Sequence, residues 1–195
     1  MAILIFLVFA ALVIGTPIAL YNRLVAARNG YKNAFAQIDV QLTRRYDLIP
    51  NLVATAKAYL AHERDTLESV IAARNAASGL LKGASADPGN AAVLEKLAGA
   101  EGVLGGALSR LMAVVEAYPD LKANQTMSQL MEELSSTENR VSFARQAFND
   151  AVLAYNNARE MFPASLLAGG FGFSPASSLE IESVAKRQAP EVKFA

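Results

Sequence analysis

The chain has 195 residues, a formal net charge of zero, no cysteine and a single histidine. This charge balance offers no broad basic surface for nucleic acid, and the missing cysteines exclude disulfides and thiolate metal sites. One histidine, His62, also excludes a metal site built from several histidines. We therefore expect no nucleic-acid partner, no metal and no cofactor. The length suggests one domain with appendages.

The first predicted element is an apolar segment, residues 2–21, that carries no charged side chain. A helix rises about 1.5 Å per residue, so this segment matches the ~30 Å hydrocarbon core of a bilayer. A cleaved signal peptide is the alternative. It would need a basic start, which is missing, and cleavage after Ala19 would place Pro17 at an unfavourable position. The segment therefore predicts one retained transmembrane anchor, with membrane lipid as a partner.

Basic side chains follow the apolar segment but do not precede it. Arg23, Arg28 and Lys32 come soon after the predicted span. The positive-inside rule then places the N-terminus outside and the rest of the chain in the cytoplasm. We expect a single-pass protein of the bacterial inner membrane. The alternative is that a domain of this size is translocated regardless of its flanking charges.

Residues 22–163 have the periodicity of helices that pack together. Large side chains recur every seven residues, with smaller apolar residues between them, which is typical of helical bundles and coiled coils. Loop-forming residues interrupt the pattern at 83–90, 118–120 and 162–163. The repeating positions include Leu24, Tyr31 and Ile38; then Leu97, Leu104 and Leu111, with Val93, Ala100 and Ala107 between them; then Met127, Leu134, Val141, Phe148, Tyr155 and Phe162.

Pro50 decides how many helices this domain contains. A proline inside a helix costs about 3 kcal/mol, whereas a first turn accepts it, and Asp47 is a suitable N-cap. A break there gives helices at about 22–47, 49–82, 90–118 and 122–162. These predict an all-α fold in which the transmembrane helix leads into an antiparallel up-and-down four-helix bundle. The alternative is a three-helix bundle with one long, kinked first helix, because the pattern continues through Pro50.

The sequence contains no convincing catalytic group. His62 has no predicted catalytic partner, so we expect no catalytic residue and no enzymatic activity. Gly102, Gly105 and Gly106 are not preceded by a strand, so they predict close helix packing and not a phosphate loop. Arg45 falls on the predicted core face and needs an internal partner such as a bundle glutamate. An anion or lipid-headgroup site is the alternative for this segment, whose notable residues are Arg44, Arg45, Asp47, Pro50 and Asn51.

The C-terminal tail, residues 164–195, begins with a Gly-rich aromatic stretch. Phe171 and Phe173 have no seven-residue pattern to bury them, and Val192 and Phe194 lie in an amphipathic end. We expect these four residues to contact the membrane or a neighbouring chain. The alternative is a tail that folds back on its own bundle. The many alanines at core positions give a thin core, which favours a homo-oligomer.

Several segments closely resemble the LemA family, and the resemblance runs nearly from end to end. They are Tyr21–Val25, Arg28–Asn29, Asn33–Leu42, Arg44–Leu52, Tyr118–Ala123, Glu138–Arg140, Tyr155–Asn156, Phe162–Pro163 and Phe171–Phe173. The resemblance implies a membrane-anchored helical bundle without an established enzymatic activity and with an anchor whose N-terminus is outside. It also implies relatives tied to the formation of membrane compartments, and an association with membrane zinc metalloproteases.

Two functions follow as expectations. The first is a non-enzymatic membrane-anchored scaffold that self-assembles and organises or shapes the bilayer. The second is an adaptor or regulator of a membrane protease or of an envelope-stress pathway. The domain boundaries expected for either function are 1–21 for the anchor, 22–163 for the bundle and 164–195 for the tail.

Overall fold

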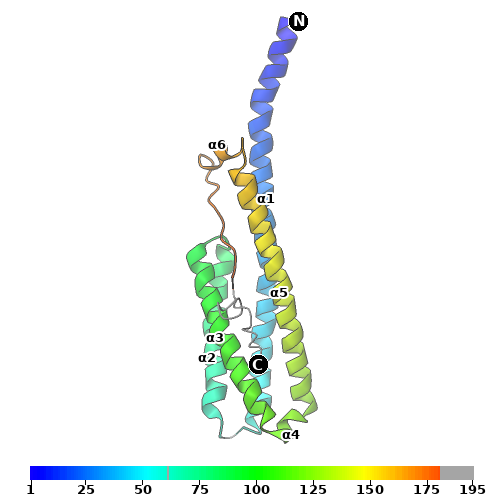
Figure 1. Ribbon diagram of the computed structural model, residues 1–195, viewed down its shortest axis with the longest axis vertical. Coiled ribbons are helices and arrows are strands. Elements are labelled where there is room, and N and C mark those ends of the chain that lie inside the picture. Colours follow the sequence, from blue (N-terminus) through cyan, green and yellow to red (C-terminus); the bar gives the residue numbers. More distant parts are fainter. Residues whose placement is uncertain (61, 181–195) are drawn as a thin grey trace, which may run out of the picture.

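A computed structural model describes residues 1–60 and 62–180, and within them all regular structure is helical, as the sequence predicted. The molecule is elongated, and one end of it is formed by the N-terminal helix alone (Figure 1). Four long helices dominate: α1 (Ala2–Lys57), α2 (Arg64–Ala86), α3 (Ala91–Glu116) and α5 (Gln125–Glu160). Two single turns, α4 (Pro119–Lys122) and α6 (Ser165–Ala168), flank α5.

The beginning of α1 has the properties of a membrane anchor. Within the residues that the structure describes, two helices could cross a bilayer by length and composition, α1 and α3. No residue in the apolar window of α1 is buried, and this part of the helix projects beyond the other elements (Figure 1). On α3, in contrast, Leu94 and Leu97 are buried in the core. In the described part of the chain, the N-terminal part of α1 alone therefore combines the length of a span with a surface that no other helix covers.

The predicted helix break at Pro50 is wrong, because α1 continues through this residue to Lys57. Proline has no N–H to give to the carbonyl one turn earlier, which belongs to Tyr46. The Nε of Arg74 on α2 donates a hydrogen bond to this Tyr46 carbonyl at 3.0 Å. An external donor thus replaces the missing one. Asp47 does not cap a helix; it lies within α1, 3.8 Å from the Arg74 guanidinium.

Three helix pairs build the core: α1 packs along α5, α2 along α3, and α1 against α2. The seven-residue positions of α1 and α5 are buried as predicted, up to Tyr155. Phe148 of α5 sits between two rings of α1, with centroids 5.4 Å from Phe35 and 6.3 Å from Tyr31. Closure into a compact four-helix bundle is not confirmed, because α3 and α5 face each other across an open groove.

The buried face of α3 differs from the predicted one by one residue. Leu97, Leu104 and Leu111 are buried as expected. The intervening buried positions are Leu94, Glu101, Leu108 and Val115, whereas Val93, Ala100 and Ala107 are only partly covered. The core face of α3 is therefore rotated relative to the prediction. Its most important consequence is that a glutamate, Glu101, occupies a core position.

Candidate functional site

Two residues of α1 converge on the buried Glu101 of α3. The Nη1 of Arg45 donates a hydrogen bond to Glu101 Oε2 at 2.9 Å, and the hydroxyl of Tyr46 donates to Glu101 Oε1. The Glu101 side chain is 1% exposed and that of Arg45 is 9% exposed. Arg45 therefore has the internal glutamate partner that its core position required, and the carboxylate has a partner on each oxygen.

Burial is the main influence on the charge of this cluster. It raises the pKa of the Glu101 carboxyl above its ordinary value, while the hydrogen bond from Tyr46 and the charge of Arg45 oppose the shift. Burial also raises the pKa of the Tyr46 hydroxyl, which therefore stays protonated as a donor. The arrangement can hold a proton, but His62 is exposed in the turn after α1 and takes no part in it.

Two other residues of the Arg44–Asn51 segment join helices, whereas the contact described for Asn51 lies within α1. Arg44 lies 3.6 Å from Glu133 of α5 in an exposed ion pair. Asp47 contacts Arg74 of α2. The Asn51 carbonyl accepts a hydrogen bond from the Thr55 hydroxyl at 2.9 Å. This segment thus connects α1 with α2, α3 and α5. Among residues 1–60 and 62–180, no group of three or more His, Cys, Asp or Glu side chains could hold a metal ion.

The groove between α3 and α5 has a volume of about 1120 Å³. Its α3 wall includes several glycines: an added Cβ at Gly102, Gly105 or Gly106 would meet no heavy atom within 4 Å. The prediction that these glycines mark close helix packing is therefore wrong. The α5 wall combines apolar residues with polar and charged ones. It contributes Ser135, Glu138, Ser142 and Arg145.

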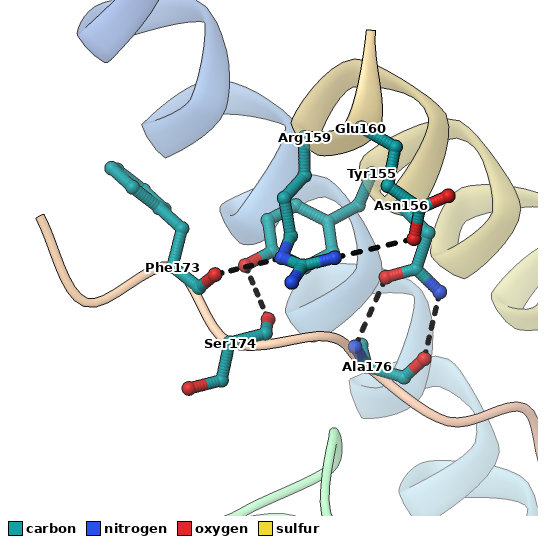
Figure 2. Close-up of polar contacts among 7 residues, drawn as sticks. All are labelled: Tyr155, Asn156, Arg159, Glu160, Phe173, Ser174 and Ala176. Atoms are coloured by element: carbon teal, nitrogen blue, oxygen red, sulfur yellow. Dashed lines mark hydrogen bonds and ion pairs between the residues drawn. The ribbon is translucent and has the colours of Figure 1, made fainter. Parts of the chain in front are cut away.

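The described part of the tail runs along α5 and is held there by two asparagines. Asn156 donates to the Ala176 carbonyl at 2.8 Å and accepts from the Ala176 N–H at 3.0 Å (Figure 2). Asn149 repeats this pair of bonds with Leu179, at 3.2 and 2.9 Å. Each amide side chain therefore satisfies both backbone groups of one tail residue.

Two further α5 side chains fix the beginning of this tail. Arg159 Nε donates to the Phe173 carbonyl at 2.9 Å, and the Tyr155 hydroxyl donates to the Ser174 carbonyl at 2.7 Å (Figure 2). On its other side, the Ser177 N–H donates to the Gly89 carbonyl in the α2–α3 loop at 3.1 Å. The tail therefore ties α5 to the α2–α3 hairpin.

The side chains of the tail alternate between core and solvent with a period of three. Phe173, Ala176 and Leu179 are buried, and the residues between them are more exposed. Phe173 is only 2% exposed, so its ring is covered by its own chain and is not free to contact lipid or a second chain. Phe171 remains 55% exposed. Val192 and Phe194 lie outside the described residues.

An exposed apolar surface lies where α1 leaves its apolar segment. The ring of Tyr21 contacts those of Phe171 and Phe173, with centroids 5.4 and 5.5 Å apart. The guanidinium of Arg28 stacks on the Phe173 ring at 4.9 Å. In Figure 1, α6 and the end of α5 lie beside this part of α1. We call the exposed side chains here the collar: Met161, Phe162, Leu166 and Phe171.

Sequence reasoning missed the polar residues that bind other elements. Glu101 was overlooked because the core face of α3 was misplaced by one residue. Arg74 gave no signal, since its role depends on a carbonyl that Pro50 leaves unpaired. Asn149 and Asn156 did carry a signal, because two amides seven residues apart lie on one face of a helix.

These features define a membrane-associated helical protein. Its N-terminal helix is apolar and exposed, its domain is helical, and the collar lies beside the end of the apolar segment. The LemA family model matches residues 34–194, and the chain belongs to this family.

The chain is also similar to magnetosome proteins. It is 31% identical to magnetosome protein MamQ of Magnetospirillum gryphiswaldense over 175 residues, which cover 82% of this chain. It is 31% identical to magnetosome protein MamQ 2 of Paramagnetospirillum magneticum over 178 residues, or 84% of this chain. The matches span 64% and 65% of these curated relatives.

Proposed function

We propose that this protein is a non-enzymatic, membrane-anchored scaffold that self-assembles and organises or shapes the bilayer. Its N-terminus is outside, and its helical domain lies in the cytoplasm at the bacterial inner membrane. The observation that carries this proposal is the collar. It consists of four large exposed apolar side chains, of which Phe171 contacts Tyr21, where the uncharged segment of α1 ends.

The collar has the chemistry of a membrane-interface element. Phe162 is 80% exposed and Leu166 is 74% exposed, which is unfavourable for a water-facing surface. Aromatic side chains are favoured at the level of lipid headgroups, and each covers on the order of 150–250 Å² when buried. A domain tethered by α1 would insert this collar into one leaflet only. Many copies inserting apolar volume on one side would bend or order the bilayer.

Two further features support a scaffold rather than an enzyme. The buried Arg45–Glu101 pair and the residues around it join helices, and His62 lies apart from them in an exposed turn. The relatives are magnetosome proteins by name, which fits a role in organising a membrane compartment.

Purification of the full chain in mild detergent, followed by reconstitution into vesicles, tests this function. We expect large, regular homo-oligomers in electron micrographs and a change in vesicle size or shape. The double variant Phe162→Gln/Leu166→Gln should lose the effect on vesicles. Phe143→Gln, which alters a 73% exposed phenylalanine in the middle of α5, should keep it. A monomer that co-purifies with a membrane protease would refute the scaffold and favour the adaptor alternative.

The orientation has its own test. A reporter that is active only in the cytoplasm, fused after Ala195, should give signal because Arg23, Arg28 and Lys32 follow the apolar segment. Signal only from a reporter that works outside the cytoplasm would overturn this part of the proposal.

A further inference from the structure

We propose that the guanidinium of Arg28, held over the ring of Phe173, is a binding site for the phosphate of an anionic phospholipid. The inference rests on the proposed membrane-anchored function and deepens it by naming the class of lipid that the domain selects. The site lies beside the collar, where α1 leaves its apolar segment. It combines an aromatic platform, a cation without a described counter-ion, and a depth that matches the headgroup layer.

The side chain of Arg28 rests on an aromatic platform. Its guanidinium carbon lies 4.9 Å from the centroid of the Phe173 ring. The platform is itself fixed, because Phe173 is 2% exposed and its carbonyl accepts a hydrogen bond from Arg159 Nε at 2.9 Å (Figure 2). A guanidinium attracted to a ring keeps its N–H donors available for an oxygen acceptor. The platform therefore presents a preorganised donor fork of the kind that binds phosphate through two hydrogen bonds.

The Arg28 guanidinium lacks a counter-ion in the part of the chain that the structure describes. It makes neither an ion pair nor a hydrogen bond there, although its side chain is partly buried. Two acidic side chains of the same region are engaged with other groups. Glu160 lies 3.2 Å from Arg159, and Asp87 accepts a hydrogen bond from Asn90 at 3.2 Å. A partly buried cation attracts an anion more strongly than one in bulk water does, because the local dielectric constant is lower.

Neighbouring cations make the surroundings of this arginine positive. The charges of Arg28 and Arg159 both act on the Tyr155 hydroxyl: burial raises the pKa of this hydroxyl, and the two arginines oppose the shift. Lys32 follows one turn after Arg28 on the same face of α1 and is exposed. Glu160 pairs with Arg159. The balance among these four charged side chains is therefore positive, which favours an anionic ligand.

The depth of Arg28 matches the headgroup layer of a bilayer. Arg28 comes seven residues after Tyr21, on the same face of α1 and about 10.5 Å further along the helix. Helical side chains lean towards the N-terminus, which here is the membrane side. The Phe173 ring connects the two side chains, because its centroid is also 5.5 Å from that of Tyr21. Headgroups form a layer of roughly 5–8 Å outside the hydrocarbon core, so the guanidinium reaches the level of the lipid phosphates.

Arg23 provides a matched control for this site. It carries the same charge at the same boundary, but it is exposed and contacts no ring of the described residues. It also lies about 140° around the helix from Arg28. Diffuse attraction of anionic lipid to basic side chains, roughly fivefold in affinity per charge, would act through both arginines alike. A built site acts through Arg28.

Lipid quenching of a single tryptophan in the reconstituted full chain tests the site. Phe171→Trp supplies the fluorophore, since the chain has no tryptophan. Brominated phosphatidylglycerol and brominated phosphatidylcholine, at equal fractions in separate vesicles, report how often each lipid lies beside it. We expect the anionic lipid to bind at least about tenfold more tightly. Arg28→Gln should lower this preference at least about fivefold and Arg28→Lys at least about threefold, because lysine cannot make the bidentate contact. Arg23→Gln should lower it less than about twofold.

The outcomes separate the site from the function on which it rests. Equal losses in Arg23→Gln and Arg28→Gln, or full preference in Arg28→Lys, would show diffuse attraction and overturn the site. Equal quenching by both lipids would refute the site but leave membrane insertion intact, whereas no quenching by either would refute the proposed function as well. Added inorganic phosphate, compared with sodium chloride at the same ionic strength, should not change the preference. A loss with phosphate alone would assign the site to free phosphate and not to a lipid.

Discussion

The Nε of Arg74 lies 3.0 Å from the carbonyl oxygen of Tyr46, the carbonyl that Pro50 leaves without its helical partner. This contact explains how α1 passes through a proline without ending. It also explains why an arginine of α2 belongs with the Arg44–Asn51 segment, although it is distant in the sequence. The proline creates the acceptor, and the neighbouring helix supplies the donor.

Replacing Arg74 should destabilise the helical domain. We expect Arg74→Ala to lower the free energy of unfolding by about 1–3 kcal/mol, because the partly buried Tyr46 carbonyl loses its donor. In the Pro50→Ala background the same substitution should cost much less, since residue 50 regains its own N–H. Denaturant unfolding followed by circular dichroism measures both effects. Arg64→Ala, which removes an exposed pair with Glu68, should change stability by less than about 0.5 kcal/mol.

The stability of the folded domain should depend on Arg45, because this residue neutralises the buried Glu101 carboxylate. Arg45→Met leaves the carboxylate without its countercharge and should cost about 3–5 kcal/mol at pH 7. The double variant Arg45→Met/Glu101→Gln should recover most of this loss, because no buried charge remains. If the double variant is as unstable as Arg45→Met, the loss comes from packing around the arginine stem and not from the unpaired charge.

The pH dependence of the same variant has a definite sign. The pKa of Glu101 in the folded protein is raised above its ordinary value of 4.5, so the folded state binds the proton more tightly than the unfolded state. The stability from this group is therefore fully present below pH 4.5 and is lost as pH rises through the raised pKa. Removing Arg45 takes away a charge that opposes the shift. The cost of Arg45→Met should consequently shrink as pH falls from 7 towards 4.5.

The sequence predicted the apolar features of this fold better than its polar ones. The anchor, the helical class and the core positions of α5 follow from hydrophobic periodicity, which a single sequence displays directly. The continuity of α1 at Pro50 depended on Arg74, which lies 28 residues from Tyr46. No local pattern encodes such a contact. The same applies to the Arg45–Glu101 pair, because the partner could be identified only once the rotation of α3 was known.

The tail illustrates a different limit. Its composition predicted that the rings of Phe171 and Phe173 would both contact the membrane or a neighbouring chain, but the structure buries the ring of Phe173. The difference lies in hydrogen bonds that Asn149, Asn156 and Arg159 make to the tail backbone. Backbone contacts of this kind do not depend on the tail's own side chains. The sequence of the tail therefore could not reveal which ring would be covered.

The core should not tolerate a charge at Phe148. This residue is fully buried between rings of α1, and Phe148→Asp would place an unpaired carboxylate there. The cost of several kcal/mol is comparable with the whole stability of a domain. We expect loss of the cooperative helical unfolding transition by circular dichroism. His62→Ala, in an exposed turn, should unfold like the natural chain; a loss of stability there would reveal a contact of His62 that the described residues do not include.

The collar should lie within the membrane interface when the protein is anchored. The chain contains no tryptophan, so one substitution introduces a unique fluorophore. We expect Phe162→Trp in reconstituted vesicles to emit at shorter wavelength and to be quenched by lipids brominated near the headgroup, because interfacial rings are partly shielded from water. Phe143→Trp, at an exposed position in the middle of α5, should emit as a hydrated indole and resist the same quencher. Equal quenching at the two sites would mean that the whole domain lies along the bilayer, whereas no quenching at either would place the collar in water and remove the main support for the scaffold function.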